Sequence, residues 1–259
     1  MSRVFITGST DGLGLLVAEF LVSQGHHVVL HARNSAREVD AKRRLPVAEA
    51  VVTGDLSSIA QTRSIAEQVN RLGRFDAVIH NAGTDYYAPC RIETKDGLSH
   101  HFAVNTLGPY ILTALIKRPK RLIYLSSSMH RGTIPDCSDI QWKRRSWNSS
   151  AAYSETKLHD LLLAFAAARY WPDVFSNAVD PGWMPTRMGG PHAPGDLNEG
   201  CRTQAWLSVS SDAAACVSGK YFHLMRQQPH DPIAKDENRQ DQLIEICGRL
   251  SGIVLNRLC

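Results

Sequence analysis

Two side chains able to exchange a proton stand four residues apart in the second half of the chain, Tyr153 and Lys157. At this spacing on a helix, the two side chains share one face. An ammonium group beside a phenol favours the phenolate, which lowers the tyrosine pKa and makes the phenol usable as an acid or base near neutral pH. The pair indicates a proton-transfer site, although many surface pairs have the same spacing.

A glycine-rich segment follows the first apolar stretch, and it contains Gly8, Gly12 and Gly14. Between a strand and a helix, such a turn lets backbone N–H groups approach a pyrophosphate, and the helix N-terminus adds a favourable partial charge. Its place in a strand–helix–strand unit favours a dinucleotide site over a purely structural turn. The predicted cofactor contacts in this segment are Gly8, Ser9, Thr10, Asp11, Gly12, Leu13 and Gly14.

The residues after the second predicted strand indicate which dinucleotide would bind. An NAD site presents a carboxylate to the ribose 2′-hydroxyl about 20 residues past the glycines. This chain has Arg33 and Asn34 there, with Arg37 one turn later. A guanidinium binds a 2′-phosphate bidentately, whereas a carboxylate would repel it. We therefore predict NADP(H) in preference to NAD(H), against the alternative that Arg33 merely lies on the surface.

The composition excludes several classes of protein. The chain has 259 residues, 43% hydrophobic and 21% charged, which is typical of a soluble globular protein. Its net charge of +4 falls short of the dense basic face of a nucleic-acid-binding protein. The longest apolar run, from Leu161 to Ala168, has eight residues, against the ~18 needed to span a membrane.

The cysteines and the N-terminus indicate a cytoplasmic protein. The chain has six cysteines, at positions 90, 137, 201, 216, 247 and 259. Their spacing includes no Cys-x-x-Cys motif and no Cys/His pattern typical of a zinc site. Reduced thiols and no metal are expected. The first residues resemble no signal peptide.

Short apolar segments alternate with helical patterns along the chain. This alternation predicts an α/β fold: a single-domain Rossmann fold, with a doubly wound, mostly parallel seven-stranded sheet and helices on both faces. The domain covers 1–259, with a cofactor-binding part at about 1–125 and a catalytic and substrate-binding part at about 126–259. The predicted strands are 4–6, 28–30, 49–53, 77–79, 121–125, 174–179 and 220–222. The predicted helices are 13–23, 36–44, 58–71, 97–116, 152–168, 199–208 and 242–258.

Two long polar segments, 129–150 and 184–198, interrupt the alternation. Segments of this length in an α/β domain are often binding loops, although a surface excursion without function is the alternative. The apolar stripe from Leu161 to Phe165 is expected in the core, with an outer edge that would suit a dimer.

Taken together in order, the motifs resemble the short-chain dehydrogenase/reductase family over about residues 3–186. The match rests on several separate segments that occur in the family's order, which makes it highly specific. These segments are Thr7-Gly8 with Gly12 and Gly14, Asp55-Leu56, Asn81-Ala82-Gly83, Asn105, Ser126 to Ser128, Tyr153 with Lys157, and Pro181-Gly182 with Thr186.

The resemblance implies a role for each catalytic residue. Tyr153 would protonate a carbonyl oxygen or deprotonate an alcohol, and Lys157 would lower the Tyr153 pKa and hold the nicotinamide ribose. Ser127 would position the substrate oxygen, with Ser126 and Ser128 as alternatives. Asn105 would hold a water that links Lys157 to solvent. The resemblance also implies cofactor contacts from Asp55, Leu56, Asn81, Ala82, Gly83, Pro181, Gly182 and Thr186.

Some features depart from the common family pattern. His80 replaces the first asparagine of the usual Asn-Asn-Ala-Gly, and 26 residues separate Ser127 from Tyr153, about twice the usual spacing. The long spacing resembles the retinol dehydrogenase and carbonyl reductase branch, as does the segment 93–98. Trp142 and Trp147 in the inserted loop would then cover a lipophilic substrate. His130 is either near the substrate or solvated, and Trp183, Met184 and Met188 either form an apolar wall or pack ordinarily.

We therefore expect an NADP(H)-dependent oxidoreductase that interconverts a ketone or aldehyde and an alcohol. A non-enzymatic NADP(H) sensor on the same fold is the alternative. A sugar-nucleotide epimerase is disfavoured, because such enzymes have a Gly-x-x-Gly-x-x-Gly loop. The expected partner is a lipophilic small molecule, with no nucleic acid and no membrane span, and the resemblance leaves a homodimer or homotetramer possible.

Overall fold

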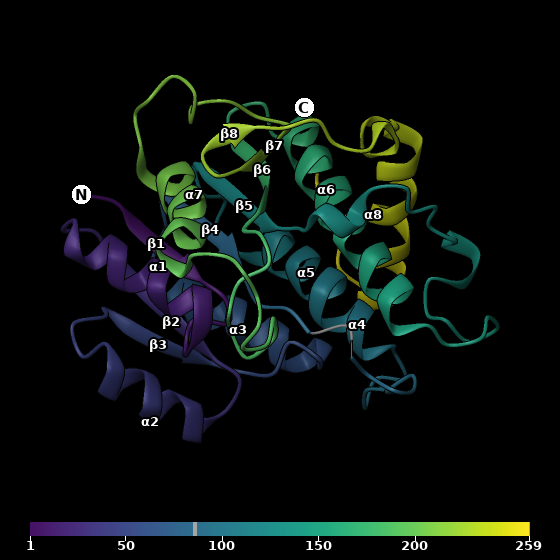
Figure 1. Cartoon of the computed structure of the whole chain (residues 1–259), viewed down its shortest axis with the longest axis horizontal. Coiled ribbons are helices and arrows are strands. Elements are labelled where there is room, and N and C mark those ends of the chain that lie inside the picture. Colours follow the sequence, from purple (N-terminus) through teal and green to yellow (C-terminus); the bar gives the residue numbers. More distant parts are fainter. Residues whose placement is uncertain (85–86, 259) are drawn as a thin grey trace.

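The computed structural model describes residues 1–84 and 87–258. Within these residues, eight strands form one sheet in the order β3-β2-β1-β4-β5-β6-β7-β8 (Figure 1). Strands β1 to β7 are parallel, and β8 pairs antiparallel with β7. The strands are β1 (Arg3–Ile6), β2 (His27–Ala32), β3 (Ala50–Thr53), β4 (Ala77–His80), β5 (Arg121–Leu125), β6 (Phe175–Asp180), β7 (Lys220–His223) and β8 (Arg226–Gln227).

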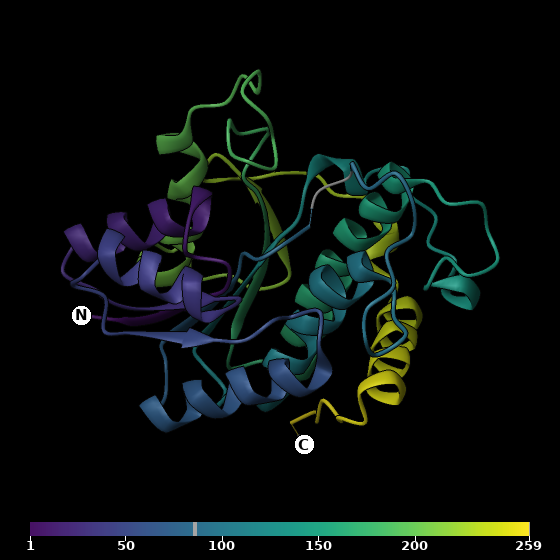
Figure 2. The ribbon, with the colours of Figure 1, turned by 90° about the horizontal axis from the view of Figure 1, so that it is seen from below.

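Helices cover both faces of the sheet. Helices α1, α2 and α7 pack on one face, and α3, α5, α6 and α8 cover the other (Figure 2). The doubly wound α/β fold predicted from the sequence is thereby confirmed. The helices are α1 (Gly12–Ser23), α2 (Ser35–Arg44), α3 (Ile59–Leu72), α4 (His100–Phe102), α5 (Gly108–Leu115), α6 (Ser149–Tyr170), α7 (Leu197–Val209) and α8 (Glu237–Ser251).

The chain reverses its direction of winding between β1 and β4, which are neighbours in the sheet. In open α/β sheets, ligands bind in the crevice at the carboxyl ends of the strands at such a reversal. The segment after β1 is the glycine-rich turn, and the segment after β4 begins with Asn81. The topology therefore brings two predicted motifs to one place.

The eighth strand was absent from the sequence prediction. It forms because Leu224 and Met225 make a two-residue turn after β7, with φ angles of 47° and 59°. Such a turn requires positive φ at both positions and normally uses Gly or Asn. Two apolar residues give no signal for it, so the short strand could not be anticipated.

Two predicted helices have different limits in the structure. The stretch 97–116 is divided into α4, a π-helix Ala103–Leu107 and α5. Pro109 explains the break, because it has no N–H to donate to the carbonyl of Asn105 four residues earlier. The C-terminal helix covers Glu237–Ser251 rather than 242–258: Asp236 caps its start, and Gly252 ends it with a φ of 67°.

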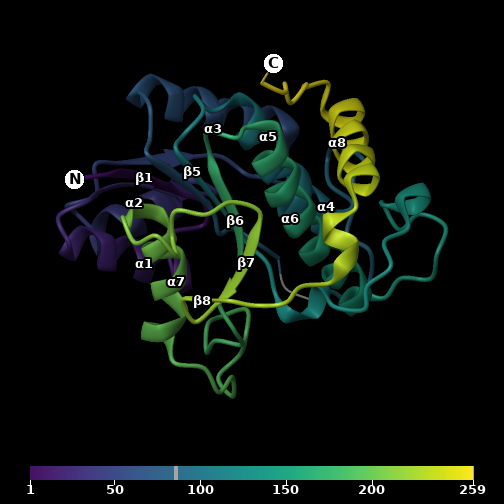
Figure 3. The same ribbon diagram turned by 90° about the horizontal axis from the view of Figure 1, so that it is seen from above.

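Helix α6 begins where Asn148 accepts a hydrogen bond from the Ala151 N–H, and it lies between the sheet and α8 (Figure 3). All residues from Leu161 to Phe165 are buried within the single chain. This stripe is therefore core, and its suggested use as a dimer edge is wrong. In the described residues, no helix has both the length and the apolar character needed to cross a membrane.

Candidate functional site

The glycine-rich turn has the backbone that a phosphate-binding loop requires. Gly8 and Gly12 have φ angles of 62° and 54°, and Gly12 is the first residue of α1. A Cβ at Gly14 would lie 2.5 Å from both Asn81 Nδ2 and Gly8 O. Glycine is required there because the loop and β4 approach so closely. The turn thus presents backbone N–H groups at a helix N-terminus, which is suited to an anion.

Asn81 and Ala82 hold this turn against the end of β4. The side-chain nitrogen of Asn81, Nδ2, donates to the backbone carbonyls of Thr7 at 2.9 Å and Gly8 at 3.1 Å. In return, Thr7 Oγ1 accepts from the backbone N–H groups of Asn81 and Ala82. The two predicted motifs are therefore in contact, and the Asn81 side chain is used inside the protein.

His31 is a residue of this site whose role the sequence did not suggest. Its Nδ1 accepts from the Gly8 N–H at 3.0 Å, so its Nε2 carries the proton and donates to Gly54 O at 2.8 Å. Burial lowers the pKa of His31, which favours this neutral form. A histidine at the end of β2 thus shapes the turn after β1. No local pattern reveals such a contact, because 23 residues separate the partners.

Guanidinium groups lie near the end of β2 as predicted. Arg33 is exposed, and Arg37 on α2 pairs with Asp11 of the glycine-rich turn. Asn34 is the N-cap of α2, where its side chain accepts from the Arg37 N–H. The side chain of Asn34 is thus engaged with its own helix, whereas Arg33 faces solvent.

The predicted adenine contacts follow β3. Asp55 Oδ1 accepts from the Ser57 N–H at 2.8 Å and shapes the turn into α3. Leu56 is buried, with its side chain against Gly108. Both lie in the segment that follows a strand at the carboxyl edge of the sheet.

Tyr153 and Lys157 share the buried side of α6. The Lys157 ammonium lies 5.5 Å from the centre of the Tyr153 ring, and both residues are buried. Lys157 Nζ donates to Leu125 O at 2.7 Å and to Asp160 Oδ2 at 2.9 Å. Burial acts to lower the pKa of Lys157, but the negative charge of Asp160 and its other neighbours raises it. Lys157 is therefore an ammonium at neutral pH.

Asn105 lies in the π-helix, beside the same lysine. A Cβ added at Gly83 would lie 3.6 Å from Asn105 Oδ1 and 3.9 Å from Lys157 Nζ. The Asn105 side chain accepts from the Thr84 N–H and donates to Thr156 Oγ1. The structure thus brings the Asn81–Gly83 motif, Asn105 and Lys157 together, and the break in the helix sets the position of Asn105.

The three serines after β5 are in different environments. Ser126 is buried and donates its hydroxyl to Lys157 O at 2.7 Å. Ser127 is half-buried and accepts from the Met129 N–H, while Ser128 is exposed. A hydroxyl already bonded to a backbone carbonyl is less available to a ligand, which favours Ser127 over Ser126.

His130 does not face solvent or a ligand. It is fully buried, its Nε2 accepts from the Asp231 N–H, and its Nδ1 donates to Ser127 O at 2.6 Å. Its ring lies edge-on against Tyr221. Both readings from the sequence were wrong, because His130 is a core residue that holds the backbone of Ser127.

Asp180, the last residue of β6, is a further residue that the sequence analysis missed. Its Oδ2 accepts from the Ser128 N–H at 2.9 Å and from the Tyr221 hydroxyl at 3.2 Å, and its Oδ1 accepts from the Gly182 N–H at 2.8 Å. One carboxylate therefore connects the serine segment, the Pro181-Gly182 turn and β7.

The segment after β6 returns to the glycine-rich turn. A Cβ at Gly12 would lie 3.7 Å from Thr186 Cγ2, so Thr186 is next to the start of α1. A Cβ at Gly83 would lie 3.7 Å from Met188 Cε, so Met188 is next to Gly83. Trp183 is exposed. Met184 is buried among glycines of its own loop and α7. Of the three residues predicted as an apolar wall, Met184 packs ordinarily, and Met188 lies beside the site.

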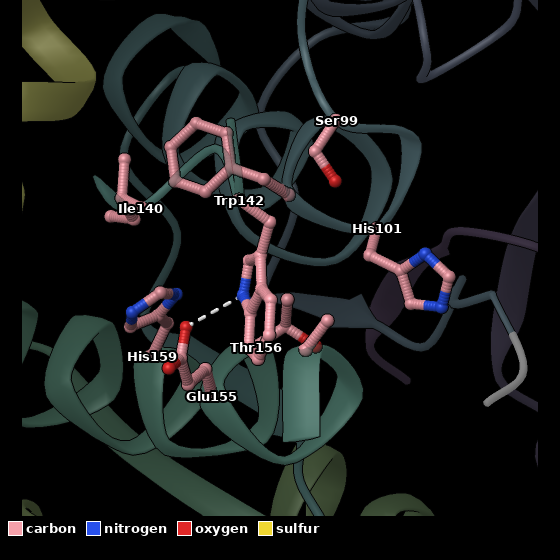
Figure 4. Close-up of a pocket in the computed structure, with 9 residues that line it drawn as sticks. Ser99, His101, Ile140, Trp142, Glu155, Thr156 and His159 are labelled. Carbon is pink, nitrogen blue, oxygen red and sulfur yellow. Dashed lines mark hydrogen bonds between the residues drawn. The ribbon is translucent and has the colours of Figure 1, made fainter. Parts of the chain in front are cut away.

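The inserted loop is anchored to α6 by Glu155. Its carboxylate accepts from Trp142 Nε1 at 2.9 Å (Figure 4). It also accepts from Arg145 at 2.6 Å, and the Arg145 guanidinium lies over the Trp142 ring. Buried Asp139 accepts the backbone N–H groups of the next turn. Trp142 thus packs against the protein, and only Trp147, which donates to Ala88 O, is partly exposed.

The arrangement can donate a proton beside an anion-binding turn. Across residues 1–84 and 87–258, no group of His, Cys, Asp and Glu side chains is placed to hold a metal ion. The described cysteines, at 90, 137, 201, 216 and 247, are free thiols. The sixth cysteine of the sequence, Cys259, lies outside the described residues.

Comparison with known proteins agrees with this geometry. A family model described as short chain dehydrogenase matches residues 2–195. An uncharacterized oxidoreductase of Emericella nidulans is 45% identical to the chain, and the aligned region covers 98% of each protein. Human retinol dehydrogenase 13 is 31% identical, over 96% of this chain and 84% of that protein.

Solved structures share the fold. An uncharacterized protein from Mycobacterium paratuberculosis matches with a TM-score of 0.83 and 24% identity, over 98% of this chain and 95% of that one. A blue fluorescent protein from a metagenomic library was solved in complex with NADPH. It matches with a TM-score of 0.69 and 19% identity, over 86% of this chain and 95% of that one. Since the family model spans well over half of the sequence, the chain belongs to the short-chain dehydrogenase/reductase family, and its relatives include retinol dehydrogenases.

Proposed function

We propose that this oxidoreductase interconverts a carbonyl compound and an alcohol, with NADP(H) as the cofactor and Tyr153 as the acid/base. The observation that carries the proposal is the buried Lys157 ammonium 5.5 Å from the Tyr153 ring, with Gly83 next to both Lys157 and Asn105. A phenol in this position has the electrostatic environment that proton transfer near neutral pH requires.

The residues present fit a dinucleotide. The turn containing Gly8 and Gly12 offers N–H groups to a pyrophosphate, and no side chain at Gly14 fills the cradle. Exposed Arg33 and the neighbouring Arg37 suit a 2′-phosphate. Asp55 and Leu56 follow β3 on the adenine side, and Pro181, Gly182 and Thr186 follow β6 beside the start of α1. When bound, the nicotinamide supplies or accepts the hydride.

The proton chemistry is assigned to four side chains. Ser127 donates a hydrogen bond to the substrate oxygen, and Tyr153 transfers its phenolic proton to that oxygen during reduction. In the reverse direction, Tyr153 takes the alcohol proton. Lys157 stabilises the phenolate by its charge, and it has a third N–H available for a ribose hydroxyl. Asn105, beside Lys157, holds a water that returns the proton from solvent.

A lipophilic ketone or aldehyde is the substrate class that we favour. Met188 provides apolar surface beside Gly83. The loop after β6 also carries exposed Trp183, and the inserted loop carries partly exposed Trp147. The similarity to a retinol dehydrogenase supports the same class.

The function is tested by NADPH oxidation with a panel of aldehydes, ketones and quinones, with NADH in parallel. We expect turnover that prefers NADPH. Tyr153→Phe should lower kcat by about 10²- to 10⁴-fold, the usual share of general acid–base catalysis. NADPH binding, followed by quenching of protein fluorescence, should be nearly unchanged in this variant.

Two outcomes would contradict the proposal. Activity retained in Tyr153→Phe would remove Tyr153 as the acid/base. NADPH binding without turnover of any carbonyl would instead favour the sensor alternative.

A further inference from the structure

Asp160 is a buried carboxylate one helical turn after Lys157, and the mechanism above does not use it. Its Oδ2 lies 2.9 Å from Lys157 Nζ, and the two side chains are 3% and 7% exposed. Both residues lie on α6, whose fold holds them at this spacing. A charge pair so far from water interacts strongly, because little solvent screens it.

The pair leaves Lys157 with a defined set of partners. An ammonium has three N–H donors. One donates to Leu125 O on β5 and one to Asp160, so a single N–H remains for the side of Tyr153. Lys157 therefore lies next to both groups, 2.9 Å from the Asp160 carboxylate and 5.5 Å from the centre of the Tyr153 ring.

Several other titratable groups face the pair. Asp180 at the end of β6 and Tyr153 on α6 act on Lys157, and the charge of Asp160 acts on Tyr124 of β5. His80 of β4 stacks on Tyr124, and Tyr221 of β7 is hydrogen-bonded to Asp180. Asp160 is the group among them in direct contact with the ammonium.

The charge of Lys157 seen by Tyr153 therefore depends on Asp160. A lone ammonium in a buried site stabilises the phenolate strongly, whereas an ammonium paired with a carboxylate has no net charge. We propose that Asp160 is a positioning residue that balances the charge of Lys157 and so keeps the Tyr153 phenol protonated, the state that donates a proton to a carbonyl oxygen. This inference rests on the proposed function and deepens it.

The charge of Asp160 is itself sensitive to pH. Burial raises the pKa of Asp160, and the adjacent Lys157 ammonium opposes that rise. When Asp160 is ionised, its negative charge opposes ionisation of Tyr153. The carboxylate extends the pH range over which the phenol retains its proton.

The test is Asp160→Asn, because the amide keeps an oxygen that accepts from Lys157 and has nearly the same volume. Without the carboxylate, the ammonium is unbalanced, and we expect the Tyr153 pKa to fall by about one unit or more. Tyrosinate absorbance measured against pH gives this pKa, with Tyr153→Phe used to assign the transition. The alkaline limb of the kcat profile for carbonyl reduction should move to lower pH by the same amount, with KM little changed.

Asp212→Asn is the control. Asp212 accepts a hydrogen bond from Trp206 Nε1 of α7, on the other face of the sheet from Lys157, so both the absorbance transition and the kcat profile should stay in place. An unchanged or raised Tyr153 pKa in Asp160→Asn overturns the inference, even if the enzyme is active. If no carbonyl is turned over, the proposed function fails, but the absorbance titration still decides the role of Asp160.

Further variants cover the case in which Asp160→Asn does not fold. Asp160→Ser is small and uncharged and should lower the Tyr153 pKa in the same way, whereas Asp160→Glu retains the charge and should leave this pKa near the wild-type value. A wild-type Tyr153 pKa in Asp160→Ser would contradict the inference.

Discussion

His31 at the end of β2 accepts a hydrogen bond from the Gly8 N–H at 3.0 Å, and the same imidazole donates to Gly54 O at 2.8 Å. One neutral ring therefore connects the turns that follow β1 and β3 through the strand between them. Because it determines where the Gly8 backbone lies, His31 contributes to the phosphate-binding turn without facing a phosphate.

Replacing this ring should weaken cofactor binding. His31→Ala leaves the Gly8 N–H and Gly54 O without their partner, which we expect to lower the free energy of unfolding by about 1–3 kcal/mol. The NADPH dissociation constant should rise several-fold, measured by calorimetric titration. His31→Asn retains an acceptor near the position of Nδ1 and should recover much of the affinity. Equal affinity in His31→Ala and wild type would show that the turn does not need the ring.

The two guanidinium groups near β2 predict a specific effect on cofactor choice. Arg33→Asp replaces an exposed positive charge with a negative one where a 2′-phosphate would lie. We expect NADPH to bind about 10- to 100-fold more weakly, the size of one or two charge-assisted hydrogen bonds, while NADH changes little. Dissociation constants for both cofactors are compared.

Arg43→Asp serves as the control for this substitution. Arg43 is an exposed residue on the same helix as Arg37, and it pairs with Asp40. Both cofactors should bind to this variant as to wild type. Equal losses of NADPH and NADH affinity in Arg33→Asp would remove the 2′-phosphate assignment.

Buried histidines predict a loss of stability in mild acid. Burial lowers the pKa of His80 and His159 to about 3 from the ordinary value of 6.5. Below pH 6.5 the unfolded chain takes up protons at these residues and the folded chain does not. The free energy of unfolding should therefore fall with pH from about 6.5 downward, by about 1.4 kcal/mol per pH unit for each such histidine.

Chemical denaturation at several pH values between 7 and 5 measures this slope. His80→Asn, which restores the more common family residue, should give a shallower slope. His192→Asn removes an exposed histidine and should leave the slope unchanged. A slope in His80→Asn equal to that of wild type would contradict the assignment to buried histidines.

Much of the fold was predictable because its signals are local. Short apolar segments and helical patterns located seven of the strands and most helices to within a few residues. The errors occurred where the backbone departs from regular geometry: the π-helix before Pro109, the C-terminal end at Gly252, and the turn at Leu224 and Met225. Each of these departures depends on a single residue or on a turn without its usual glycine. The hydrophobic periodicity of the sequence contains no signal for such features.

The site could be predicted in part for the same reason. Tyr153 and Lys157 are one turn apart on a helix, and the glycine spacing is contained in a few residues, so both can be read from the chain. His130 was misread because a polar residue in a loop gives no sign that its ring is buried and bonded to Ser127 and Asp231. The long loop was recognised, but not its anchoring by Glu155.

The amino-acid sequence by itself determined the family, the order of strands and helices, and the positions of the phosphate turn and the tyrosine–lysine pair. Only the tertiary structure decided how these are held: His31 is hydrogen-bonded to Gly8, and Asp180 lies between the serine segment and Gly182. The Asp180 contact to Ser128 joins residues 52 apart in the chain. Such contacts follow from which strands become neighbours, and hydrogen-bond partners are chosen only when packing removes the polar groups from water.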